Sequence, residues 1–214
     1  MARFHELEVT GIQKTIRDAV VVSLKPKDDD AEAFDFIQGQ YLTFRRDFDG
    51  EELRRSYSIC SPLQEQGRRT VGVKRIEDGR FSGFAQTLKQ GDRIQVMPPQ
   101  GRFAVDVTEG ADHNYLMIAA GSGITPSLSM TTYLYDRGAG TDIVFLHCAK
   151  RPSEIIARQR LEMMAARVPE LKLYFLVEED DPYHVWTGFR GRLNQLMIGL
   201  IAGDYMDREV YCCG

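Results

Sequence analysis

Hydrophobic residues in the first half of the chain fall in short runs, many of which alternate with polar residues. These runs cover residues 5–9, 20–24, 41–45, 55–59, 70–76, 92–97 and 103–105, and Gly, Asp and Pro turns separate them. Regularly spaced short strands with one buried face predict a small antiparallel β-barrel. One short helix is predicted within it over residues 82–89, with Ser82 as its N-cap and Gly91 just past its end.

The second half alternates strands with helices. Apolar runs at 115–120, 142–148, 171–177 and 209–213 alternate with helical patterns that begin at Pro126 or cover 155–168 and 192–201. This order predicts an α/β domain whose parallel sheet is covered by helices on both faces. We therefore expect a β-barrel domain at 1–107 and an α/β domain at 113–214, with the boundary between Val107 and His113.

A glycine-rich turn connects the first strand of the second half to its helix. The sequence there, YLMIAAGSGITPS, spans residues 115–127. Gly121 and Gly123 permit a tight turn and a close ligand, while Thr125 is expected as N-cap and Pro126 as the first helical residue. Free amides at such a helix start bind anions such as phosphate. A tight turn without a ligand uses the same residue types, so the motif alone leaves both interpretations open.

Two runs in the first half have residues suited to a cofactor. In RSYS, alternation along a strand places Arg55 and Tyr57 on one face and Ser56 and Ser58 on the other. In GRFS, residues 79–82, Gly79 and the Ser82 hydroxyl stand where free amides could hold a second phosphate. The alternatives are an ordinary strand with an exposed arginine and a capped surface helix.

Two further candidates follow strands of the second half. Lys150 and Arg151 come directly after the second strand, where a dinucleotide fold places the adenosine ribose and where an arginine can pair with a 2′-phosphate. The alternative is a pair of solvated loop charges. Cys213 ends the last strand, as an inert core thiol or as a group that faces a cofactor.

Composition narrows the class of protein. A net charge of −4 and a pI near 5.6, without a concentrated basic segment, argue against nucleic acid as the main partner. The sequence shows neither a membrane-length apolar run nor a signal-peptide pattern, so we expect no membrane partner and a cytoplasmic location. The four cysteines and four histidines lack metal-ligand spacing, so we expect no bound metal.

Taken together, the motifs resemble those of a known family. In order along nearly the whole chain they are RSYS, VKR, GRFS, MPPQGRF, AAGSGITP, AKRPSE, GFRGRL and VYCCG. The chain is similar to the FAD/NAD(P)-binding module of the ferredoxin–NADP reductase superfamily, particularly the reductase components of bacterial oxygenases of the phenylacetyl-CoA oxygenase reductase type. Members of the family continue beyond the Cys-Gly pair, so the resemblance implies a C-terminally incomplete module at Gly214.

The resemblance also implies roles for individual residues. Arg55 would bind the flavin pyrophosphate, Tyr57 would lie against the isoalloxazine, and Ser58 would lie near N5. Ser58 and Cys213 are the expected catalytic residues, Cys213 lying near the nicotinamide. The remaining cofactor-binding residues implied are Ser56, Val73, Lys74, Arg75, Gly79, Phe81 and Ser82 for FAD, and Gly121, Ser122, Gly123, Ile124, Thr125, Pro126, Arg151 and Gly214 for the nicotinamide dinucleotide.

The function implied is a flavoprotein oxidoreductase. It would transfer hydride from NADPH or NADH to FAD, with NADPH slightly preferred, and pass single electrons to a ferredoxin-like iron–sulfur protein or domain that serves an oxygenase. A second hypothesis is a flavin-binding electron-transfer subunit that docks to redox partners without using NAD(P)H itself. A third is a structural or sensory protein without a cofactor.

Overall fold

The computed structural model describes residues 3–61, 67–105, 113–137 and 141–214. The chain divides into two compact units, Met1–Val105 and Asp106–Gly214. Most of the predicted boundary, residues 107–112, lies outside the described residues, so its position stays a prediction.

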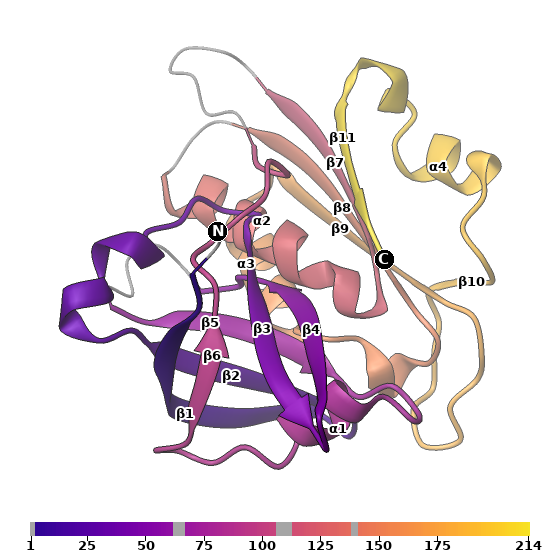
Figure 1. Ribbon diagram of the computed structural model, residues 1–214. Coiled ribbons are helices and arrows are strands. Elements are labelled where there is room, and N and C mark those ends of the chain that lie inside the picture. Colours follow the sequence, from indigo (N-terminus) through magenta and orange to yellow (C-terminus); the bar gives the residue numbers. More distant parts are fainter. Residues whose placement is uncertain (1–2, 62–66, 106–112, 138–140) are drawn as a thin grey trace. The chain divides into compact units, whose positions relative to one another are not determined.

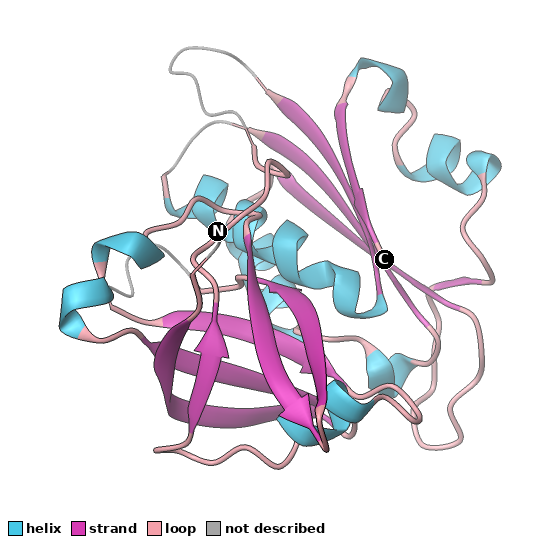
Figure 2. Cartoon of the chain, in the orientation of Figure 1, coloured by secondary structure: helices cyan, strands magenta, loops and turns pink. Residues whose placement is uncertain are grey.

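The first unit is an antiparallel β-structure (Figures 1 and 2). In its described part, six strands pair in the order β4-β3-β6-β1-β2-β5. Beyond the end of β4, Ile59 bridges Val71 and the Cys60 N–H donates to the Thr70 carbonyl at 2.8 Å, which brings the two edges of the sheet together. The strands are β1 (His5–Ile16), β2 (Ala19–Lys25), β3 (Tyr41–Phe48), β4 (Glu51–Ser58), β5 (Arg69–Lys74) and β6 (Arg93–Val96).

Alternation along these strands builds the core of the first unit. Leu7 and Val9 of β1 are fully buried, as are Leu42 of β3 and Val71 of β5. They pack in one cluster with Phe81 of α1 (Arg80–Ala85). Two short 3-10 helices, Asp28–Asp30 and Glu32–Phe34, follow β2 and insert Phe34 into the same core.

Two details of the first unit differ from the sequence prediction. The helix begins at Arg80 with Gly79 as its N-cap, so Ser82 lies inside the helix. The Ser82 hydroxyl is hydrogen-bonded to the Ile76 N–H and the Gly79 carbonyl, which precede the helix. It ends at Ala85, well short of the predicted end at Lys89. Residues 103–105, predicted as a strand, form no strand.

The second unit contains a parallel sheet with strand order β10-β9-β8-β7-β11 within the described residues. Helices α2 and α3 lie on one side of this sheet and α4 on the other (Figure 1). The elements are β7 (Asn114–Ala120), α2 (Ile124–Asp136), β8 (Asp142–Ala149), α3 (Arg158–Arg167), β9 (Leu171–Val177), β10 (Phe189–Arg190), α4 (Gln195–Ile201) and β11 (Glu209–Cys213), with 3-10 turns at Gly121–Gly123, Pro152–Glu154 and Tyr205–Asp207.

Buried apolar strands explain this sheet. Leu116, Val144 and Leu176 from three neighbouring strands pack on one face against Ile201 of α4. Helices α3 and α4 start later than predicted: Ala157, with φ of 55°, interrupts the first pattern, and Asn194 caps the second by accepting from the Met197 N–H at 2.9 Å. The two-residue strand β10 was not predicted, because two residues show no periodicity.

Candidate functional site

The RSYS segment forms the end of β4, and its faces are those that alternation predicts. Tyr57 pairs with Leu42 and Arg55 with Phe44, on the face that turns toward the core, whereas Ser56 pairs with Thr43 on the other face. Tyr57 stacks on Phe81, with ring centroids 5.9 Å apart and an interplanar angle of 30°. Burial raises the pKa of the Tyr57 phenol, and the nearby Arg55 charge opposes that shift. Tyr57 is therefore a neutral ring held in place from the core side.

Arg55 is exposed and retains free hydrogen-bonding capacity. Its Nη1 donates to the Arg54 carbonyl at 2.7 Å, and no carboxylate among the described residues forms an ion pair with it. Arg54 instead pairs with Glu52 at 2.7 Å and lies over the Phe4 ring. Of these two neighbours, only Arg55 presents an uncompensated guanidinium beside Tyr57.

The serines of the same strand differ in their surroundings. Ser56 is exposed, and its hydroxyl lies 2.9 Å from the Thr43 hydroxyl. Ser58 is half-buried at the strand's end, opposite Tyr41. Ser58 therefore lies on the face opposite Tyr57, so its side chain does not join the Arg55–Tyr57 face.

The VKR segment ends β5. The Val73 side chain is 2% exposed and belongs to the core, and its carbonyl accepts from Gln86 Nε2 at 3.2 Å. Lys74 forms an ion pair with Asp18 at 3.7 Å, and Arg75 is exposed. Any contact of Val73 with a ligand must therefore come from its backbone.

The GRFS segment starts α1 with a tightly bonded turn. The Ser82 hydroxyl accepts from the Ile76 N–H and donates to the Gly79 carbonyl, both at 3.1 Å. A Cβ on Gly79 would lie 2.4 Å from that hydroxyl, so only glycine fits. The Phe81 side chain is 3% exposed and packs in the core. These side chains stabilise the turn itself. An anion could therefore bind only to the free backbone N–H groups at the start of α1.

In the second unit, the glycine-rich turn has the strand–turn–helix geometry that the sequence predicts. Gly121 has a φ of 50°, and Gly121–Gly123 forms a 3-10 turn before α2. The N-cap prediction is wrong, because Gly123 occupies that position and the Thr125 hydroxyl donates back to the Ser122 carbonyl at 3.1 Å. The helix therefore also begins earlier than predicted, at Ile124, and Pro126 is its third residue rather than its first. The Ser127 hydroxyl, fully buried in the first turn, has no hydrogen-bond partner among the described groups.

The end of β11 lies directly against this turn. A Cβ on Gly123 would be 2.3 Å from the Cys213 carbonyl oxygen, and one on Gly214 would be 2.5 Å from the Ala120 Cβ. Burial raises the pKa of the Cys213 thiol, and neighbouring Cys212 adds to the effect. The thiol is therefore protonated near neutral pH. The structure thus joins two segments that are about 90 residues apart in sequence.

Lys150 and Arg151 follow β8 and share one carboxylate. Arg151 donates to Glu179 Oε2 from Nε at 3.1 Å and from Nη2 at 2.8 Å, and Lys150 Nζ lies 3.3 Å from Glu179 Oε1. The Arg151 hydrogen bond is the main cause of the lowered pKa of Glu179. Glu179 is not among the residues predicted from the sequence. Its position directly after a parallel strand, in the run VEEDD, was the available signal.

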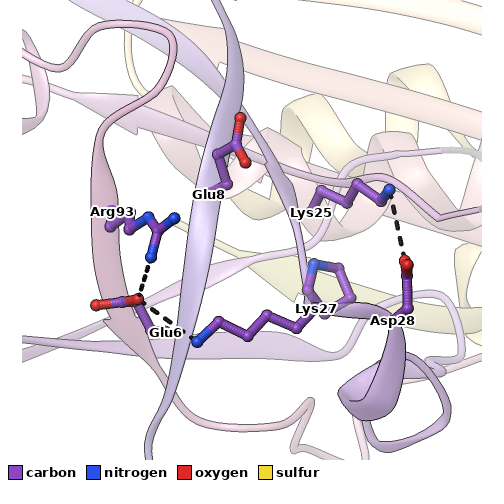
Figure 3. A pocket seen from close by; sticks show the side chains of 7 residues that line it. Glu6, Glu8, Lys25, Lys27, Asp28 and Arg93 are labelled. Atoms are coloured by element: carbon purple, nitrogen blue, oxygen red, sulfur yellow. Dashed lines mark hydrogen bonds and ion pairs between the residues drawn. The ribbon is translucent and has the colours of Figure 1, made fainter.

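The other candidate binding sites in the described residues are less suited to a cofactor or a metal. A cavity of about 290 Å³ on the first unit is lined by charged side chains from β1, β6 and the end of β2 (Figure 3). Its cations are paired with carboxylates, namely Arg93 and Lys27 with Glu6 and Lys25 with Asp28, so it offers no surplus charge for a cofactor phosphate. All four cysteines are free thiols. Across the described ranges, no group of His, Cys, Asp or Glu side chains suits a metal, and no helix is long and apolar enough to cross a bilayer.

A β-barrel in which Arg55 lies beside Tyr57 at the end of a strand, followed by an α/β unit with a glycine turn, has the layout expected of a two-domain protein that binds dinucleotide cofactors. Comparisons with known proteins specify the class. Residues 6–105 match the oxidoreductase FAD-binding domain family, and residues 117–214 match the oxidoreductase NAD-binding domain family. The chain belongs to these flavoprotein oxidoreductases of the ferredoxin–NADP reductase type.

Relatives include reductase subunits of oxygenase systems. The chain is 46% identical to a stachydrine N-demethylase reductase subunit of Rhizobium meliloti, over 85% of this chain and 51% of that protein. It is 38% identical to a glycine betaine monooxygenase reductase subunit of Chromohalobacter salexigens, over 85% of this chain and 49% of that protein. The chain thus spans about half the length of the curated relatives it matches.

Solved structures agree in fold. The cytochrome b5 reductase domain of Ulva prolifera nitrate reductase superposes with a TM-score of 0.81 at 21% identity, over 93% of this chain and 82% of that one. The ferredoxin reductase of carbazole 1,9a-dioxygenase gives 0.79 at 20% identity, over 98% and 60%. These neighbours bear out the predicted fold of a β-barrel followed by a parallel α/β domain.

Proposed function

We propose that the chain is the NAD(P)H-oxidising flavin module of an oxygenase reductase. It takes hydride from NADPH or NADH onto FAD and passes single electrons to a ferredoxin-like iron–sulfur acceptor, which serves an oxygenase component. The observation that carries the proposal is the close approach of Gly123 to Cys213. It brings together the two segments that the family resemblance assigns to the nicotinamide dinucleotide. The oxygenase systems named for the relatives support the choice of partner.

FAD would be held by the first unit. Arg55 has the free guanidinium that a pyrophosphate needs, and the Tyr57 ring, backed by Phe81, gives the flavin a flat apolar surface. The backbone amides of residues 80–82 would take the second phosphate beside Gly79, whose own N–H donates to the Ile76 carbonyl, while the Val73 to Arg75 backbone would lie along the ring. Ser56 and Ser58 would supply hydroxyls at the strand's end. When bound, FAD supplies the conversion of a two-electron hydride into single electrons.

The nicotinamide dinucleotide would be held by the second unit. The turn at residues 121–125 would present its free backbone N–H groups to the pyrophosphate at the start of α2, while Pro126, which has no N–H, would only shape the helix start, and the Ile124 N–H already donates to the Gly121 and Ser122 carbonyls. Cys213 and Gly214 would position the nicotinamide, and the protonated thiol is suited to packing rather than to nucleophilic attack. Arg151 would favour NADPH slightly by pairing with its 2′-phosphate. A cytoplasmic location remains a prediction from the sequence.

Anaerobic stopped-flow spectroscopy tests the function. Purified protein should bind FAD and turn yellow. NADPH or NADH should then bleach the flavin absorbance at a rate at least as fast as steady-state turnover. Retention of FAD without bleaching by either nucleotide would favour the electron-transfer subunit that does not use NAD(P)H. Failure to take up FAD would overturn the proposal.

A further inference from the structure

Two strand ends of the second unit bring a basic and an acidic loop together. Strands β8 and β9 are parallel, with Ala149 opposite Val177, so the residues after each strand leave the sheet at the same edge. Lys150 and Arg151 follow β8, and Glu179 lies two residues beyond β9. This is the edge at which a dinucleotide fold binds its ligand.

The backbone fixes the acidic residue in this position. The Glu179 N–H donates to the Lys150 carbonyl at 2.8 Å, and the Glu178 N–H donates to the Ala149 carbonyl at 3.2 Å. The Glu179 carboxylate then accepts both Arg151 hydrogen bonds on one oxygen and approaches Lys150 with the other. The contact therefore rests on an ordered strand extension rather than on two flexible side chains alone.

A second carboxylate repeats the arrangement two residues further on. A hydrogen bond from the Ser153 side chain is the main cause that lowers the pKa of Asp181 to about 2. The Tyr183 N–H also donates to Asp181 Oδ1 at 2.9 Å, which holds the acidic loop in shape. The three side chains of the loop after β8 that suit a phosphate, Lys150, Arg151 and Ser153, are thus engaged by carboxylates from the loop after β9.

We propose that Glu179 is a specificity-determining residue that sets the balance between NADPH and NADH. A 2′-phosphate must displace the Glu179 carboxylate from Arg151 and is repelled by its charge, whereas a ribose 2′-hydroxyl can donate a hydrogen bond to it. Glu179 therefore offsets the advantage that Arg151 gives to NADPH and makes the preference for it small. The inference rests on the proposed function, because it takes the loop after β8 as the adenosine ribose site.

The test compares Glu179→Gln with wild type in the full chain loaded with FAD. Glutamine keeps the size of the side chain and removes its charge. We expect the ratio of kcat/KM for NADPH to that for NADH to rise about tenfold, the factor of one charge-assisted hydrogen bond, mainly through a lower KM for NADPH. Calorimetry with adenosine 2′,5′-bisphosphate and 5′-AMP should show the same change in relative affinity without any redox chemistry.

Two variants show whether the effect is specific. Glu178→Gln is the matched control, because Glu178 pairs with Arg192 at 3.2 Å and should leave the ratio unchanged. In an Arg151→Ala background, Glu179→Gln should change the ratio less than it does in wild type, because the part of its effect that passes through Arg151 is gone while its direct repulsion of the 2′-phosphate remains. An unchanged ratio in Glu179→Gln, or an equal change in Glu178→Gln, overturns the inference while leaving the nucleotide site intact. Failure of both adenosine nucleotides to bind any variant would overturn the proposed nucleotide site and the inference with it.

Discussion

Gly123 lies against the backbone of Cys213 so closely that a side chain between them has no room. A Cβ at Gly123 would be 2.3 Å from the Cys213 carbonyl oxygen and 2.6 Å from the Gly214 Cα. Gly123 has a φ of −64°, which any residue can adopt, so the requirement for glycine comes from this close packing and not from backbone conformation. The glycine turn and the end of the last strand are therefore one structural unit.

Replacing Gly123 with alanine should separate the turn from β11. We expect Gly123→Ala to lower kcat/KM for NADPH and NADH at least tenfold, because a displacement of about 1 Å in a positioning segment has effects of this size or larger. FAD content should remain at the wild-type level. Gly83→Ala is a suitable control, since a Cβ at Gly83 meets nothing within 4 Å. Wild-type turnover in Gly123→Ala would show that the close approach does not position the nicotinamide.

Arg55→Ala should weaken FAD binding at least tenfold. The substitution removes a charge-assisted contact to the pyrophosphate worth about 1.5–3 kcal/mol. Arg54→Ala is the matched control, because Arg54 lies on the other face of β4 and pairs with Glu52. Fluorescence titration of the apoprotein measures both affinities. Equal affinities in a folded Arg55→Ala protein would remove the RSYS segment from the flavin site.

Arg208 should be important for the stability of the second unit. Its side chain is 2% exposed and donates to Asp204, to Asp142 and to the Tyr115 carbonyl, which ties the start of β11 to β7 and β8. We expect Arg208→Ala to cost about 3 kcal/mol of unfolding free energy, as for other buried paired charges. Arg192→Ala, which removes a guanidinium that is 87% exposed, should cost less than about 1 kcal/mol. Urea unfolding followed by tryptophan fluorescence reports on this unit, since Trp186 is the only tryptophan in the chain.

The contacts of Arg208 with Asp142 and Asp204 also predict that the free energy of unfolding depends on pH. Burial disfavours the charged form of Asp142, but hydrogen bonds from Arg208 and Lys172 outweigh it and lower its pKa, and Arg208 also lowers the pKa of Asp204. Because folding lowers these pKa values, the unfolded chain binds more protons in acid, so stability rises with pH there. The contribution is complete above the ordinary aspartate pKa of about 3.9 and is lost as pH falls through the lower folded values. The free energy of unfolding, measured from about pH 2 to 5, should therefore show a smaller slope against pH in Arg208→Ala than in wild type; equal slopes would contradict this.

Amide hydrogen exchange should be faster in residues 192–214 than in the strands of the first unit. Leu196 and Leu200 of α4 are 73% and 71% exposed, Met206 is 80% exposed, and β11 is an edge strand. Local opening costs least where few apolar contacts hold a segment. Exchange followed by mass spectrometry measures the difference. Equal protection in the two regions would show that the packing of α4 against the sheet is enough to protect residues 192–214 from local opening.

The sequence by itself determined the architecture and most of the candidate segments. Alternation with period two predicted the antiparallel unit, and the strand–helix order predicted the parallel sheet, because each pattern reflects which faces must be buried. The faces of Arg55 and Tyr57 followed from the same alternation, which the register of β3 and β4 confirms. Local chemistry also identified the glycine turn.

Only the tertiary structure decided which distant groups meet. Ser82 and Thr125 have the residue types of helix caps, yet their hydroxyls bond to the Gly79 and Ser122 carbonyls, and glycines occupy both cap positions. The contact of Gly123 with Cys213, and that of Arg151 with Glu179, join segments on different strands. Such contacts depend on strand order and register, which bring together residues with no local relationship in sequence, and so no periodicity of the chain encodes them.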